Sequence, residues 1–108
     1  DGTCIRDYIH VMDLADGHLA ALLNLIKNEP KIINLNLGTG IGTSVLEIIK
    51  IFEEVNKCKL PYKIVGRRDG DVASLVADSR KAKKYLEWTP QKTLEDVCLD
   101  SFKWINLN

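Results

Sequence analysis

The stretch IINLNLGTGIGTSVLE, residues 32–47, joins an apolar run to a glycine-rich loop and the start of a helix. The run 32–37 alternates in part between apolar and polar residues, which predicts a β-strand. Glycines follow at every second position from 38 to 42. Ser44 and Glu47 then have the spacing of a capping box, which predicts a helix N-terminus. Strand, glycine loop and capped helix in this order indicate an α/β fold.

Two more strands and three more helices are expected around this stretch. β-Favouring runs predict the strands at residues 8–11, within the segment 5–11, and at residues 62–65. Apolar side chains at helical spacing predict helices from Asp13 or Asp16 to residues 27–29, from Asp78 to the stop at 88–90, and from Thr93 onward. A mixed α/β domain with so few strands for about four helices leaves apolar helix faces without partners. We therefore expect a part of a longer protein that packs against another domain.

Composition excludes several classes of protein. The chain has 108 residues, the size of one domain, and its 15 basic and 15 acidic residues give a net charge of zero. A neutral chain lacks the excess of basic residues that captures nucleic acid or anionic membranes. The apolar stretch 19–26 is far shorter than the ~20 residues of a spanning helix. Cys4, Cys58 and Cys98 form no CxxC or zinc pattern, which favours a reducing, cytoplasmic location over a disulfide framework.

The glycine loop and a charged loop are candidate ligand sites. Glycines before a helix allow a ligand to approach the backbone, but a plain tight turn is equally compatible. A dinucleotide fingerprint is disfavoured because the pattern is GxGxG, and because Arg67, not an acidic residue, follows the next expected strand. In the segment 67–71, RRDGD, arginines suit phosphate and aspartates suit sugar hydroxyls. The alternative is an exposed loop whose charges compensate one another.

The polar start of segment 6–11, RDYIHV, is a third candidate, where side chains line a cleft. His10 and His18 lack metal-ligand spacing, and His10 is expected to be a hydrogen-bonded structural residue. Trp88 and Trp104 lie beside apolar helical stripes and are expected in the core or at an interface.

Three segments together resemble a known family. Residues 1–18 read DGTxxRDYIHVxDLAxGH, residues 36–45 read NLGxGxGxSV, and residues 67–71 read RRxGD. In this order and spacing they resemble UDP-glucose (UDP-galactose) 4-epimerases. The tail, ADxxKA at 77–82 and LxWxP at 86–90, is similar to extended short-chain dehydrogenase/reductases in general. The resemblance covers essentially the whole chain, but only the C-terminal third of such an enzyme.

The resemblance implies an isomerase of galactose metabolism with two domains. Residues 1–108 correspond to the C-terminal UDP-sugar-binding domain, and the N-terminal Rossmann domain that holds NAD is missing from this chain. In the family, hydride passes from C4 of UDP-glucose or UDP-galactose to NAD and returns to the other face of the rotated keto sugar. A Tyr-x-x-x-Lys pair assists, and no tyrosine here is followed four residues later by lysine. The chain alone is therefore expected to be inactive and to associate with itself through exposed apolar surface.

Five positions match the family's substrate-binding residues, and none matches a catalytic, cofactor or metal residue. The matches are Arg6 and Arg68 for the diphosphate, Tyr8 beside the nucleotide, Val45 as an apolar contact and Asp71 for the ribose. Leu75 departs from the pattern, since some members carry a tyrosine near the nucleotide there. Two alternatives remain open: a related enzyme such as a UDP-glucuronate decarboxylase or epimerase, and a non-catalytic nucleotide-binding or interaction module.

Overall fold

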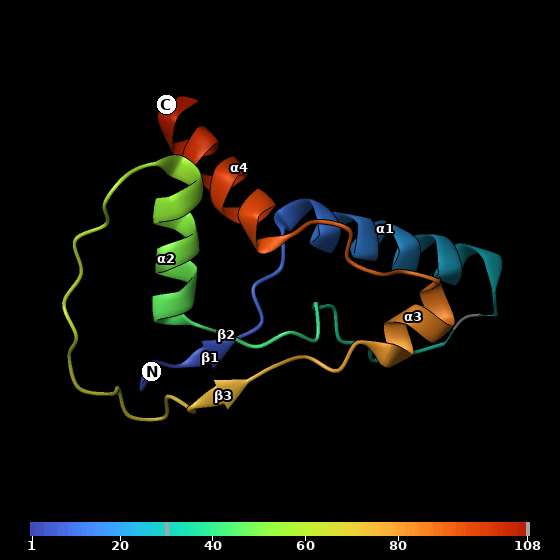
Figure 1. The fold of residues 1–108 in the computed structure, drawn as a ribbon. Coiled ribbons are helices and arrows are strands. Elements are labelled where there is room, and N and C mark those ends of the chain that lie inside the picture. The colour runs from blue at the N-terminus through green and yellow to red at the C-terminus, as the bar shows by residue number, and fades with distance from the viewer. Residues whose placement is uncertain (30, 108) are drawn as a thin grey trace.

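A computed structural model describes residues 1–29 and 31–107 of the chain as an α/β arrangement of four helices and three short strands (Figure 1). The predicted fold class is thereby confirmed. The helices are α1 (Val11–Lys27), α2 (Val45–Asn56), α3 (Arg80–Leu86) and α4 (Leu94–Leu107). The strands are β1 (Ile5–Arg6), β2 (Thr43–Ser44) and β3 (Ser74–Leu75).

The three strands form one small sheet in the order β2-β1-β3. The central strand β1 is antiparallel to β2, with Arg6 opposite Thr43, and parallel to β3, with Arg6 opposite Leu75. The sheet therefore joins three segments that are distant in sequence. It also holds Arg6 at the point where they meet.

Helix α2 begins directly at the end of β2, as the capping box predicts. The backbone N–H of Glu47 donates to Ser44 Oγ at 3.1 Å, and the backbone N–H of Ser44 donates to Glu47 Oε2 at 2.7 Å. Two of the free N–H groups at the helix start are satisfied in this way. Helix α4 begins with the same device, because Thr93 and Asp96 exchange hydrogen bonds of 2.9 and 3.2 Å.

The helices pack in two pairs, α2 with α4 and α1 with α3. Figure 1 shows α4 beside the upper end of α2, and α3 beside the C-terminal half of α1. Phe52 of α2 and Phe102 of α4 meet edge to face, with ring centroids 5.6 Å apart. Asn24 of α1 donates to the backbone carbonyl of Tyr85 in α3 at 3.0 Å.

The strand expected within segment 5–11 exists, but at Ile5–Arg6 and not at residues 8–11. The strands expected at 32–37 and 62–65 are wrong. Residues 8–10 are irregular, and Val11 begins α1 because the backbone N–H of Met12 donates to His10 Nδ1 at 3.0 Å. His10, and not Asp13 or Asp16, is thus the cap of this helix. The other two runs form no strand in the described chain, where no neighbouring backbone pairs with them. An apolar run becomes a strand only when a partner satisfies its hydrogen bonds.

The molecule exposes far more surface than a folded chain of its size. Its accessible surface is 8214 Å², against about 6,100 Å² expected for a monomer of this mass. Its radius of gyration is 16.5 Å, against about 13 Å for a compact domain of this length. Within residues 1–29 and 31–107, the buried hydrophobic side chains are Ala82, Trp88 and Cys98. The expected core position of Trp88 is confirmed, and the core is small.

No helix among the described residues combines the length and the apolar character needed to cross a membrane. The same part of the chain holds no group of three or more side chains suited to ligate a metal ion.

Candidate functional site

All five residues predicted to bind substrate line one cavity of about 460 Å³. The cavity lies between the N-terminal segment with β1, the first turns of α2 and the long loop that follows α2. The five residues are Arg6, Tyr8, Val45, Arg68 and Asp71. They come from three segments that the sheet and the capped helix bring together. Leu75, the position that departs from the family pattern, lies in β3 opposite Arg6 and is 62% exposed.

An ion pair between Arg6 and Asp71 forms the polar centre of the cavity. Arg6 Nη2 lies 2.5 Å from Asp71 Oδ1, and the two side chains are only 28% and 18% exposed. Arg68 lies further out, 88% exposed, with Nη2 3.7 Å from Asp71 Oδ2. The hydrogen bond from the Cys4 thiol, together with the two guanidinium groups, holds the pKa of Asp71 below its ordinary value. The carboxylate is therefore ionised at neutral pH and ready to accept hydrogen bonds.

Tyr8 borders this cavity and a second one of about 480 Å³ that includes Thr39 and the first residues of α4. Burial raises the pKa of the Tyr8 hydroxyl, and the positive charge of Arg6 opposes this shift only in part. The phenol is neutral across the physiological range. It can donate one hydrogen bond and offer its ring face to a ligand.

Sequence reasoning missed Cys4 as part of the site, and it placed Arg67 in a candidate phosphate-binding segment without its contact to Cys4. Cys4 Sγ donates to Asp71 Oδ2 at 3.4 Å, and Arg67 Nη1 donates to Cys4 Sγ at 3.4 Å. Arg67 Nη2 also donates to the backbone carbonyl of Gly2 at 3.3 Å. A signal was available for Cys4, because alternate residues of an extended segment share one face. Cys4, Arg6 and Tyr8 follow that period and all line the cavity.

The glycine loop binds a carboxylate of the chain itself. The backbone N–H groups of Thr39 and Gly40 donate to the Asp7 carboxylate at 2.9 to 3.0 Å, and that of Ala77 donates to it at 3.3 Å. A Cβ atom on Gly38 would lie 2.7 Å from Asp7 Oδ2. The donors that the ligand-lining interpretation offered to a phosphate are thus engaged by Asp7. The loop does not fit the pyrophosphate of a dinucleotide.

The remaining polar residues of the N-terminal motif hold the framework together. His10 Nε2 lies 2.9 Å from Asp100 Oδ2 in α4, so the structural role expected for His10 is confirmed. The buried Asp13 carboxylate accepts the backbone N–H groups of Gln91 and Lys92 at 3.0 and 2.9 Å. The indole N–H of Trp88 donates to the Asp13 backbone carbonyl at 3.1 Å. These bonds fasten the segment before α4 to α1.

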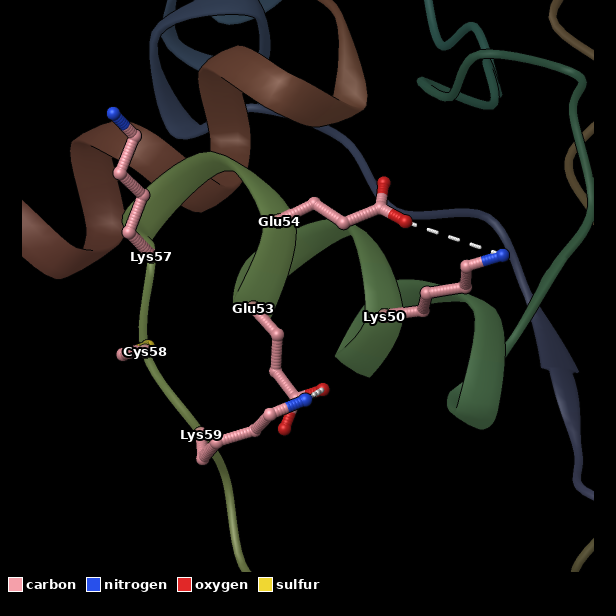
Figure 2. A pocket seen from close by; sticks show the side chains of 6 residues that line it. All are labelled: Lys50, Glu53, Glu54, Lys57, Cys58 and Lys59. Atoms are coloured by element: carbon pink, nitrogen blue, oxygen red, sulfur yellow. Dashed lines mark ion pairs between the residues drawn. The ribbon is translucent and has the colours of Figure 1, made fainter.

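Another cavity, of about 550 Å³, lies at the C-terminal end of α2 and is shown in Figure 2. Its acidic side chains pair locally, with Lys50 Nζ 3.9 Å from Glu54 and Lys59 Nζ 3.7 Å from Glu53. The Lys57 side chain points away from both pairs (Figure 2). None of the predicted site residues lines this cavity. The cavity around Arg6 and Asp71 is therefore the candidate site.

The fold agrees with what comparison with known proteins finds. The family model described as GDP-mannose 4,6 dehydratase matches residues 1–101, and the chain belongs to that family. Within the family the chain is similar to UDP-glucose 4-epimerases. It is 52% identical to UDP-glucose 4-epimerase 3 of Oryza sativa subsp. japonica, over 100% of this chain and 29% of that protein. It is 48% identical to UDP-glucose 4-epimerase of Bacillus subtilis (strain 168), over 100% of this chain and 32% of that protein.

A solved structure shares the fold throughout. UDP-glucose 4-epimerase from Bifidobacterium longum, in complex with NAD+ and UDP, superposes with a TM-score of 0.93 at 44% identity. The match covers 100% of this chain and 32% of that one. The resemblance predicted from the three motifs is thereby confirmed. The chain spans about a third of the length of the relatives that it matches.

Proposed function

We propose that this chain is the UDP-sugar-binding part of an NAD-dependent UDP-glucose 4-epimerase, which interconverts UDP-glucose and UDP-galactose. The observation that carries the proposal is the convergence of Arg6, Tyr8, Val45, Arg68 and Asp71 on one cavity. The relatives at 48 to 52% identity favour the 4-epimerases over other enzymes that modify nucleotide sugars.

The cavity has the chemistry that a nucleoside diphosphate requires. Arg6 and Arg68 supply two guanidinium groups for the diphosphate, since arginine matches phosphate oxygens with paired donors. The Asp71 carboxylate accepts the ribose hydroxyls, and Val45 and Tyr8 contact the nucleotide with apolar surface and a neutral phenol. A grip on the nucleotide alone leaves the hexose free to turn. A 4-epimerase needs that freedom, because its keto intermediate must present both faces to the cofactor.

NAD is assigned to a second domain, of the Rossmann type, outside this chain. The glycine loop does not fit a dinucleotide, because its N–H donors bind Asp7. The accessible surface exceeds that of a compact monomer by roughly 2,000 Å², which is more than the ~800 Å² that each partner of a standard protein–protein interface buries. The apolar runs 32–37 and 62–65 support the same assignment, since neither has a strand partner among residues 1–29 and 31–107.

Further properties follow from the proposal. The epimerase is cytoplasmic and serves galactose metabolism, in keeping with three free cysteines. It binds neither nucleic acid nor membranes through this chain, in keeping with the zero net charge of the 108 residues. The chain alone is inactive and self-associates as a homodimer or larger assembly, because apolar side chains of α1 and α4 are exposed.

The test uses the full-length protein. Arg68→Ala removes a guanidinium that is 88% exposed and lies beside Asp71. Arg80→Ala, at the start of α3, removes a guanidinium that is 91% exposed and lies beside Asp78. We expect Arg68→Ala to weaken UDP binding by about tenfold, the lower end for a charged hydrogen bond. Calorimetry should find UDP affinity unchanged in the matched control Arg80→Ala. Equal affinity in the two variants would contradict the assignment.

Product analysis separates the proposed activity from its rivals. With UDP-galactose, the full-length protein should yield UDP-glucose. Turnover of UDP-glucuronate, but not of UDP-galactose, would indicate a UDP-glucuronate decarboxylase or epimerase. UDP binding without turnover of either sugar would indicate a non-catalytic module.

A further inference from the structure

Both oxygens of the Asp71 carboxylate accept hydrogen bonds from side chains of this chain. Arg6 Nη2 binds Oδ1 at 2.5 Å on one side, and the Cys4 thiol donates to Oδ2 at 3.4 Å on the other. Neither partner lies near Asp71 in sequence, since both precede it by more than 60 residues. The orientation of the carboxylate is therefore a tertiary feature of the site.

This arrangement leaves the carboxylate able to bind a diol. An ionised carboxylate offers about four acceptor positions, two on each oxygen. Arg6 takes one position on Oδ1 and Cys4 takes one on Oδ2, so each oxygen keeps one position for a ligand. The Arg68 guanidinium, 3.7 Å from Oδ2, is too distant to take another by direct hydrogen bonding. Two adjacent acceptors at a fixed angle match the two neighbouring hydroxyls of a ribose.

The Cys4 thiol restrains the orientation of the carboxylate in addition to filling space. With Arg6 alone, the carboxylate would be held at one oxygen and free to rotate about its Cβ–Cγ bond. The thiol restrains the second oxygen, and because it is a weak donor, it leaves most of the acceptor strength of that oxygen to a ligand. Arg67 fixes the thiol in turn, since its Nη1 donates to Cys4 Sγ at 3.4 Å and its Nη2 donates to the Gly2 carbonyl at 3.3 Å.

We infer that Cys4 is a positioning residue of the nucleotide site, which sets the Asp71 carboxylate to receive both ribose hydroxyls. The inference rests on the proposed function, because it presupposes that Asp71 binds the ribose of a uridine diphosphate. It adds a discriminating property that packing alone would not produce. Loss of the thiol should weaken recognition of the ribose hydroxyls specifically, while contacts to the diphosphate persist.

The experiment measures how strongly the full-length protein prefers UDP over its 2′-deoxy and 3′-deoxy analogues by calorimetry. Wild type should prefer UDP, and Asp71→Asn should lose most of that preference. Cys4→Ala should reduce the preference about threefold to tenfold, the range of one modest hydrogen bond. Cys4→Ser should retain part of it, because a hydroxyl is a stronger donor but its shorter Cβ–O bond leaves it farther from Oδ2. Cys58→Ala, the same substitution in the distant cavity of Figure 2, should leave it unchanged.

Two results would overturn the inference while leaving the proposed function intact. The first is an equal loss of affinity for UDP and its deoxy analogues in Cys4→Ala, which indicates packing only. The second is an unchanged affinity for UDP and for both analogues in Cys4→Ala, which indicates that the thiol has no part in nucleotide binding. Failure of the wild-type protein to bind UDP would overturn the proposed function and this inference together, so the two failures are distinguishable.

Discussion

Replacement of Asp7 should release the glycine loop from the strand that carries Arg6. The Asp7 carboxylate accepts backbone N–H groups from Thr39, Gly40 and Ala77, and also the Thr39 hydroxyl. Asp7→Ala leaves three backbone donors without their acceptor, at about 1–3 kcal/mol each when buried. Because Gly40 is exposed and water can reach it, we expect a total loss near the low end, about 3 kcal/mol.

Asp7→Asn gives a graded comparison with Asp7→Ala. The amide oxygen can occupy the place of Oδ2, which accepts from all three backbone donors, and the amide nitrogen can donate to the Thr39 hydroxyl. The contacts to Oδ2 survive, the one from the Thr39 N–H to Oδ1 is lost, and so is the charge. Since charge-assisted hydrogen bonds are roughly twice as strong as neutral ones, we expect about half the loss, near 1.5 kcal/mol.

Hydrogen exchange of the full-length protein, followed by mass spectrometry, measures this release locally. Amides in peptides covering residues 38–41 and 76–78 should exchange about 100-fold faster in Asp7→Ala and about tenfold faster in Asp7→Asn. Asp16→Ala, at an exposed position of α1, is the control and should change neither peptide. Equal exchange in wild type and Asp7→Ala would refute the role assigned to the carboxylate.

Two further perturbations test the framework. Gly38→Ala should lower the melting temperature of the full-length protein by an amount corresponding to about 1–3 kcal/mol, because its Cβ would lie 2.5 Å from the Ala77 methyl; Gly66→Ala, where nothing lies within 4 Å, is the control. Hydrogen bonds from Thr93 lower the pKa of Asp96 below its usual 3.8, so its ionised form stabilises the fold above that value. That contribution is lost as pH falls through the lowered pKa. The stability difference between wild type and Asp96→Asn should therefore shrink in acid, and a gap independent of pH in denaturant titrations would count against the cap.

The helices could be predicted because their signals are local. Apolar spacing and the capping pairs Ser44–Glu47 and Thr93–Asp96 lie within a few residues of the helix starts that they define. The strands could not, because two-residue strands exist only where distant segments pair. Residues 43–44 and 74–75 carry no β signal of their own and become strands by lying beside Ile5 and Arg6. The stronger β patterns at 32–37 and 62–65 have no such neighbour in the described chain.

The candidate site was predictable by resemblance, but its internal contacts were not. The five matched residues do line one cavity, as their motifs implied. Nothing in the spacing shows that Arg6 pairs with Asp71, since 65 residues separate them. The hydrogen bond from Cys4 to Asp71 joins residues 67 positions apart, and the pairing of β1 with β3 brings the two segments together.

The spacing of the glycine loop now has a structural reason. Alternate residues of the N-terminal segment face opposite ways: Cys4, Arg6 and Tyr8 line the cavity, while Ile5 and Asp7 face the loop. A Cβ atom on Gly42 would lie 2.7 Å from Ile5 Cγ2, and one on Gly38 would lie 2.7 Å from Asp7 Oδ2. The glycines recur every two residues because they pack against an extended segment, whose side chains on one face also recur every two residues. Binding of a pyrophosphate would require the different spacing GxGxxG. The glycine loop packs against the Ile5 and Asp7 face of the N-terminal segment, and Arg6 and Tyr8 lie on the opposite face. Substitutions in the loop should therefore alter nucleotide affinity without contacting the nucleotide.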